Sequence, residues 1–108
     1  MRKTLFFDVD TQYDFMYPQG KLYVRGAENI IPNLNTLTKF ADKSKITIVS
    51  SLDAHIKNDP EFRQFPQHCV AHTKGQRKIS QTIARHTKQI IIKKCTFDVF
   101  SNPKAKRI

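Results

Sequence analysis

The sequence predicts an α/β fold built on a parallel sheet. Three short apolar runs, residues 4–8, 46–50 and 89–93, are rich in β-branched residues and are typical of buried strands. Between the first two runs, apolar positions in residues 28–44 recur at three- and four-residue spacing, which indicates an amphipathic helix. A strand, a helix and a second strand at this spacing form a βαβ unit, whose strands lie parallel.

The segments between these elements are irregular. Pro32 fits the expected helix only if it lies in about the first turn, where proline is tolerated. Residues 21–24 are expected to form a short extended segment. Residues 51–88 contain a single expected helical turn, at 80–86. A long irregular segment in a compact domain is usually functional or disordered, and its aromatic and histidine residues argue against disorder.

Length and composition favour one soluble domain. The 108 residues, 39% of them hydrophobic, suffice for one core. No stretch is long and apolar enough for a membrane span, and Asp8 and Asp10 interrupt the first apolar run before it reaches the length of a signal peptide. Two cysteines give no disulfide framework, so a cytoplasmic location is expected.

The positive charge is concentrated in the last third of the chain. Residues 74–108 contain 10 Lys or Arg and 1 acidic residue, whereas residues 1–73 contain 9 and 8. Such a segment is a solvated face, a nucleic-acid-binding surface or a contact for an acidic partner. The chain lacks interleaved aromatic residues and RNA-binding signatures, so the solvated face is favoured and nucleic acid is kept as an alternative.

Three polar residues follow the three expected strands. Asp10, Asp53 and Lys94 each lie just past a strand end. Parallel strands bring their carboxyl ends to one edge of the sheet, where open α/β sheets bind ligands. We therefore expect the three side chains to converge, although an aspartate at such a place also caps turns and a lysine is often only solvated.

A second group of residues has the composition of a metal site. Asp53 and His55 are two residues apart, so in extended backbone they point to the same side, and His68 supplies a third ligand. Two histidines and a carboxylate suit zinc, iron or manganese. The alternative is that Asp53 caps a turn and the histidines are ordinary loop residues.

Neither cysteine is expected to be a nucleophile. Cys69 follows His68 directly, but neighbouring residues in an extended chain face opposite ways, so His68 is badly placed to activate it. The same argument applies to Cys95 beside Lys94. A buried, inert thiol is the expected state of Cys69.

Four ordered motifs resemble one family. They are DTQYDF at 10–15, SLDAH at 51–55, FPQHCVAHTKGQ at 65–76 and IIKKCTFDVFSNP at 91–103. Together they resemble the isochorismatase-like superfamily of cysteine hydrolases, and within it the nicotinamidase branch. The resemblance implies a three-layer α/β/α Rossmann-like parallel sheet that is incomplete at its C-terminus, with residues 1–108 as the N-terminal portion of a truncated single domain.

The resemblance also implies roles for individual residues. Asp10 takes the place of the family's general base and Lys94 that of its assisting lysine. Phe15 and Phe65 match aromatic positions that line the pocket for the substrate ring. The implied reaction is amide hydrolysis, for example of nicotinamide to nicotinate and ammonia.

In the nicotinamidase branch the residues corresponding to Asp53, His55 and His68 hold a divalent metal. Zinc is expected first, with iron and manganese as alternatives. Glu61 stands where some members have a further metal-binding histidine, and His72 stands where the family has a glycine. His72 is expected to disturb the turn if the position requires a positive φ.

The motifs that carry the resemblance do not include the family's nucleophile. The family's catalytic cysteine lies in a later G-x-x-x-x-x-C-V segment, which these 108 residues do not contain. Three interpretations follow: a truncated nicotinamidase-like hydrolase, a non-catalytic remnant that binds metal, a small ring-bearing ligand or nucleic acid, and a hydrolase of another branch of the superfamily. The missing strands would leave a sheet edge uncovered, through which oligomers could form.

Overall fold

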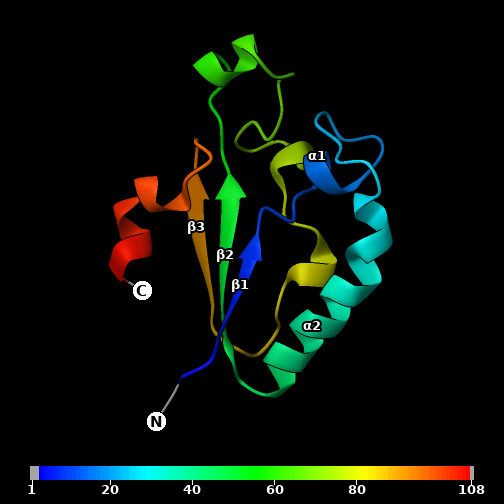
Figure 1. Ribbon diagram of the computed structural model, residues 1–108, viewed down its shortest axis with the longest axis vertical. Helices are drawn as coiled ribbons and strands as arrows, with labels where there is room; N and C mark the ends of the chain where they lie inside the picture. The colour runs from blue at the N-terminus through cyan, green and yellow to red at the C-terminus, as the bar shows by residue number, and fades with distance from the viewer. Residues whose placement is uncertain (1–2, 108) are drawn as a thin grey trace.

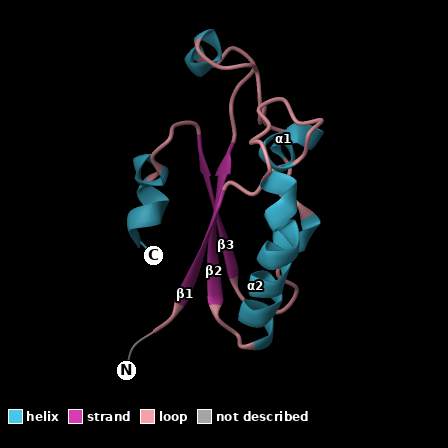
Figure 2. Cartoon of the chain, turned by 45° about the vertical axis from the view of Figure 1, so that its right-hand side comes forward, coloured by secondary structure: helices cyan, strands magenta, loops and turns pink. Residues whose placement is uncertain are grey.

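The computed structural model describes residues 3–107. Three parallel strands, β1 (Leu5–Val9), β2 (Thr47–Asp53) and β3 (Gln89–Lys94), form one sheet in the order β1-β2-β3 (Figure 1). Helix α2 (Ile31–Lys43) lies on one side of the sheet and the C-terminal 3₁₀ turns lie on the other (Figure 2). The expected α/β class with a parallel sheet is confirmed.

The two faces of the sheet carry different residues. Phe6 of β1 stacks on Phe40 of α2, with 6.1 Å between the ring centroids, so this face is covered by the helix. Side chains alternate along a strand, so Val9 lies on the opposite face, paired in register with Ser51 of β2. Asp10, which follows β1, meets Asp53 and Lys94, the last residues of β2 and β3, at the carboxyl end of this second face.

Strand β2 ends three residues later than its sequence suggests. The prediction ended it at residue 50, but pairing with β3 continues to Asp53. Ser50 and Ser51 are fully buried, and their hydroxyls donate to the carboxylates of Asp8 and Asp10 at 3.0 and 2.8 Å. Buried serines satisfied by distant acceptors are compatible with a central strand, although a hydrophobicity pattern does not reveal them.

The expected helix is divided into two parts. Its first residues form a 3₁₀ turn, Ala27–Ile30, and α2 begins at Ile31 with Pro32 in its first turn, as predicted. The expected extended segment at 21–24 is not a strand: residues 21–22 form a turn and residues 23–24 have no regular secondary structure. Of the expected helical turn at 80–86, only Ser80–Thr82 is helical, in 3₁₀ form.

The remaining helical pieces are short. Helix α1 (Tyr13–Met16) follows β1 directly. The other 3₁₀ turns are Pro60–Arg63, Lys74–Gln76, Val99–Ser101 and Pro103–Arg107. Within residues 3–107, no helix is long and apolar enough to cross a membrane.

Ion-pair and hydrogen-bond contacts hold the long irregular segment between β2 and β3 in place. Lys78 forms an ion pair with Asp8 of β1 and donates to Thr11 at 2.7 Å, and burial lowers the pKa of Lys78. At the other end of the sheet, Asp42 of α2 accepts the backbone N–H groups of residues 85–87 at 2.7 to 3.2 Å, which lowers the pKa of Asp42. The segment is therefore held to β1 and to α2.

The edge strand β1 exposes an apolar face. In the described chain β1 pairs only with β2, so its outer edge is open. Leu5, Phe7 and Val9 are 49%, 45% and 60% exposed on the same face. The uncovered edge that the sequence predicted is therefore present, and oligomer formation through it stays a prediction.

His72 adopts the backbone conformation that the expected turn requires. Its φ is +69°, in the left-handed region that favours glycine. We predict that His72→Gly stabilises the protein by about 1 kcal/mol, because the side chain no longer crowds the backbone in that conformation. Urea unfolding measures the difference.

The matched control is His86→Gly, because His86 is also exposed but has a negative φ. This variant should be neutral or less stable. A His72→Gly protein less stable than the parent would contradict the assignment of backbone strain to His72.

Candidate active site and metal centre

Asp10 is turned toward the open face of the sheet by its backbone. Its φ of +53° is uncommon outside glycine, and such residues cluster at functional sites. The backbone N–H of Asp10 donates to the carbonyl of Ser51 at 3.1 Å, and the Ser51 hydroxyl donates to the Asp10 carboxylate at 2.8 Å. These bonds fix the carboxylate on the Val9 side of the sheet.

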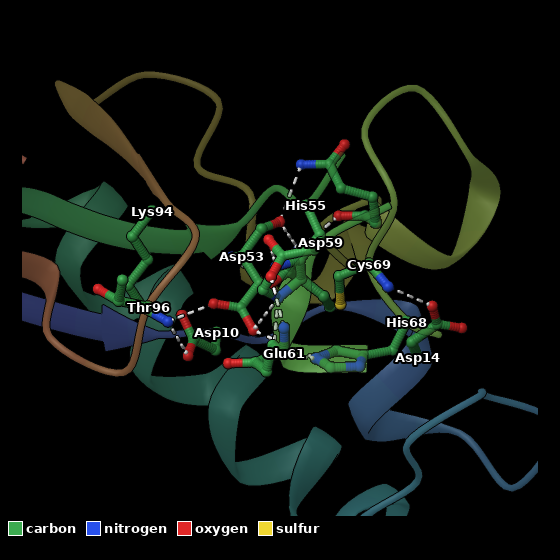
Figure 3. Close-up of polar contacts among 12 residues, drawn as sticks. Asp10, Asp14, Asp53, His55, Asp59, Glu61, His68, Cys69, Lys94 and Thr96 are labelled. Atoms are coloured by element: carbon green, nitrogen blue, oxygen red, sulfur yellow. Dashed lines mark hydrogen bonds and ion pairs between the residues drawn. The ribbon is translucent and has the colours of Figure 1, made fainter. Parts of the chain in front are cut away.

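Lys94 joins the ends of all three strands. Its buried ammonium forms an ion pair with Asp10 at 2.9 Å and a second, shorter one with Asp53 (Figure 3). Burial by itself lowers the pKa of Lys94, but hydrogen bonds and charges from Asp53 and Asp10 outweigh it, so the pKa is raised. The structure thus brings Asp10, Asp53 and Lys94 together, as predicted.

A fully buried glutamine, which the sequence reasoning missed, holds the strand ends in place. The side-chain amide of Gln12 donates to the carbonyls of Asp53 and Gln76 at 2.8 and 2.7 Å, and its oxygen accepts the N–H of Asp53 at 2.8 Å. The one available signal was the glutamine of the DTQYDF motif. Partners 41 and 64 residues away cannot be inferred from local spacing.

Asp14 has a structural role beside the site. Its carboxylate accepts the backbone N–H groups of Cys69 at 2.8 Å and Lys21 at 3.0 Å. Gly75 packs against it so closely that a Cβ there would lie 2.1 Å from a carboxylate oxygen. Asp14 therefore joins three loops, and these contacts explain why its carboxylate is buried.

Asp53, His55 and His68 form one buried cluster. They offer ligand atoms that all lie within 4.8 Å of one another. The Nδ1 atom of His55 contacts Asp59 at 2.8 Å, and that of His68 contacts the carbonyl of Pro66 at 2.7 Å. Metal-binding histidines usually donate one ring N–H to such a partner, which leaves the other nitrogen free for the metal.

The free nitrogens point to a common centre, where Glu61 joins them. The Nε2 atom of His55 is buried and makes no well-formed hydrogen bond among the described residues, although two carboxylate oxygens lie within 3.5 Å of it. One Glu61 oxygen lies 3.1 Å from His55 Nε2 and 3.2 Å from His68 Nε2, and one Asp53 oxygen lies at 3.5 and 3.8 Å from the same atoms. Two imidazoles and two carboxylates are a donor set that fits zinc, iron or manganese.

A cavity of about 550 Å³ opens beside the cluster and the ion pair. Its polar end contains Asp10, Asp53, Glu61, His68 and Lys94. The remaining lining residues are mostly apolar: Val9, Phe15, Met16, Leu22, Val24, Arg25, Gly26, Ala27, Ile30, Phe65 and Phe97. A mostly apolar cavity with a few convergent polar groups is typical of a small-molecule site.

The two aromatic residues predicted to line a ring pocket both lie in this cavity. Phe15 packs against His68 with 5.6 Å between ring centroids. Phe65 lies edge-on to Phe97 at 6.0 Å. They give the cavity flat apolar walls next to its polar end.

Neither cysteine belongs to the cavity. Cys69 is fully buried and does not line the cavity, and its sulfur lies 3.9 Å from the carbonyl oxygen of Gly75. Burial raises the pKa of Cys69 far above its usual range, and the nearby charges of Asp53, Asp14 and Asp10 raise it further. Cys95 is exposed at the surface.

The comparisons with known proteins agree with this geometry. A family model described as "Isochorismatase domain" matches residues 4–108. The chain belongs to the isochorismatase family. No curated protein sequence matches the chain.

Solved isochorismatase-like structures share the fold. An isochorismatase-like hydrolase from Alkaliphilus metalliredigens is 28% identical, with a TM-score of 0.82 over 92% of this chain and 56% of its own. A pyrazinamidase of Pyrococcus horikoshii in complex with zinc is 31% identical, with a TM-score of 0.73 over 85% of this chain and 51% of its own. This isochorismatase-family chain spans little more than half the length of these structures.

The two thiols should differ sharply in reactivity. We predict that iodoacetamide labels Cys95 in the native protein and leaves Cys69 unmodified, because only the thiolate reacts and burial suppresses it at Cys69. Mass spectrometry after brief labelling measures both sites. A Cys95→Ser variant should be labelled only after unfolding, and rapid labelling of this variant in the native state would contradict the burial of Cys69.

Proposed function

We propose that the chain supplies the substrate pocket, the metal site and the proton-transfer residues of a nicotinamidase-like amidohydrolase. The observation that carries the proposal is the cavity whose lining contains both the Asp10–Lys94 ion pair and, from the buried cluster, Asp53 and His68 together with Glu61. The zinc complex of the similar pyrazinamidase supports a metal-dependent reaction on an aromatic amide.

In the proposed reaction Asp10 moves the proton. Its carboxylate takes the proton of an attacking thiol, whose sulfur then bonds to the amide carbonyl carbon. The same proton is returned to the amide nitrogen as the carbon–nitrogen bond breaks, which releases ammonia. Water then hydrolyses the thioester to the carboxylic acid and restores the thiol.

Lys94 supports the charges that appear during these steps. It is held within ion-pair distance of Asp10, so the contact keeps the Asp10 carboxylate at the cavity wall. It also lies at the cavity wall, where it stabilises the developing oxyanion. Phe15 and Phe65 provide flat surfaces for the substrate ring.

The metal would be held by Asp53, His55 and His68, together with Glu61. When bound, it supplies a Lewis acid that binds the ring nitrogen of the substrate and fixes the orientation of the amide. Asp59 keeps the ring of His55 in the required orientation through its 2.8 Å contact with Nδ1. Zinc is the first choice for this donor set, with iron and manganese as alternatives.

The nucleophile of the proposed reaction lies outside these 108 residues. Cys69 and Cys95 are the cysteines of the chain, and neither lines the cavity. The same observation favours a second candidate function, in which the chain binds metal and a ring-bearing amide without turnover. Nucleic-acid binding through the basic residues after position 73 stays a prediction.

Metal binding is the first test. We predict that the purified chain binds one zinc ion and that His55→Ala or His68→Ala abolishes binding, because each removes a nitrogen aimed at the common centre. Glu61→Gln should weaken binding by at least about tenfold. Metal content after dialysis and competition with a coloured chelator measure both effects.

The matched controls are His86→Ala and Asp42→Asn, since both residues lie outside the cluster. These variants should bind zinc like the parent protein. Unchanged zinc content in both His55→Ala and His68→Ala would contradict the metal site.

Substrate binding and turnover test the amide pocket that both candidate functions require. We predict that the zinc-loaded chain binds nicotinamide, that chelation abolishes this binding and that no ammonia is released. Calorimetry and an ammonia assay measure binding and turnover. Lack of nicotinamide binding would contradict the proposed substrate class.

The external nucleophile has its own test. Ammonia release at an enzyme-like rate that is lost in Asp10→Asn would place the nucleophile within these residues. Asparagine is the suitable substitution because it tolerates the positive φ of Asp10. Reading the coding DNA past the codon for residue 108 in all frames shows whether a G-x-x-x-x-x-C-V segment follows.

A further inference from the structure

Arg25 has no counter-ion in the cavity that it lines. It lies in the loop between α1 and the 3₁₀ turn Ala27–Ile30 and is exposed to solvent. Its guanidinium makes no ion pair with any carboxylate of residues 3–107. A guanidinium at the solvent-exposed wall of the cavity, without a carboxylate partner in the protein, is free to pair with an anionic group of a bound molecule.

The loop holds Arg25 at the cavity in a defined place. On one side, the N–H of Val24 donates to the carbonyl of Phe15 at 2.9 Å. On the other, Gly26 has a φ of +85°, and its N–H donates to the Tyr23 hydroxyl at 3.0 Å. That hydroxyl in turn donates to the Glu28 carboxylate at 2.6 Å. The backbone N–H groups on both sides of Arg25 are therefore held by hydrogen bonds.

The remaining charges of the cavity balance one another. Its lining contains three carboxylates, Asp10, Asp53 and Glu61, and one ammonium, Lys94. With a divalent metal ion bound, these groups have a net formal charge of zero. A neutral amide therefore suits the cavity without Arg25, and Arg25 adds one positive charge that a neutral amide leaves unpaired.

We propose that Arg25 selects an amide substrate that carries a carboxylate group at the end remote from the amide. The inference rests on the proposed function and narrows its substrate class to the monoamide of a dicarboxylic acid. The planar guanidinium accepts a carboxylate in a two-bond arrangement, which gives direction as well as charge. A cavity of about 550 Å³ lies within the range of small-molecule sites that accept substituted rings.

Binding to the zinc-loaded chain tests the proposal without turnover. The two probes are nicotinamide and 5-carbamoylpyridine-3-carboxylate, which differ by one carboxylate. We expect the carboxylate probe to bind about three- to tenfold more tightly, a size typical of a solvent-accessible charged pair. The preference should shrink as the salt concentration rises.

Arg25→Gln should remove the preference, so that the two probes bind this variant equally, and Arg25→Lys should retain part of it. Arg85→Gln is the matched control, because Arg85 is also exposed but lies outside the cavity. Since the readout is a difference between two probes on one protein, a general loss of folding cannot imitate it.

The outcomes separate this inference from the proposed function. Equal affinities for the two probes in the parent protein, or a preference that persists in Arg25→Gln, overturn the role of Arg25 and leave the amide pocket standing. Failure of both probes to bind overturns the pocket and this inference together.

Discussion

The buried contact of Lys94 with Asp10 and Asp53 is the interaction on which the site depends. A buried ammonium without partners is strongly destabilising, so the two carboxylates must lie where they do for β3 to end there. Asp53 connects this contact with the metal cluster, because one of its oxygens faces Lys94 and the other faces the two histidines. The Asp53 carboxylate is therefore common to the ion pair with Lys94 and to the cluster with His55 and His68.

The architecture was predictable because it follows from periodic patterns. Apolar runs and helical spacing gave three parallel strands and a helix, and the parallel arrangement alone required Asp10, Asp53 and Lys94 to converge. The end of β2 was not predictable from hydrophobicity, because Ser50 and Ser51 are polar. Their buried hydroxyls find partners far away in the sequence, which are Asp8 and Gln89 for Ser50 and Asp10 for Ser51. Such strand ends depend on contacts between residues far apart in the sequence.

The residues of the site were predictable, but their orientations were not. Residue types and spacing indicated Asp53, His55 and His68, and the resemblance drew attention to Glu61 without assigning it. What the sequence lacked was orientation: nothing local shows that a Glu61 oxygen lies between two imidazoles. The arginine of the GKLYVRGAE loop gave no signal of its own, since its meaning comes from the charges that already balance around the cavity.

The open edge of β1 makes the folding equilibrium of this chain depend on its surroundings. Leu5, Phe7 and Val9 remain 49%, 45% and 60% exposed in the folded chain, so this strand contributes less apolar burial than a covered one would. Any polypeptide that pairs with β1 binds the folded state and not the unfolded one, and so raises the free energy of unfolding according to its concentration and affinity. A melting temperature of the isolated chain is accordingly a lower bound on its stability in the presence of such a partner.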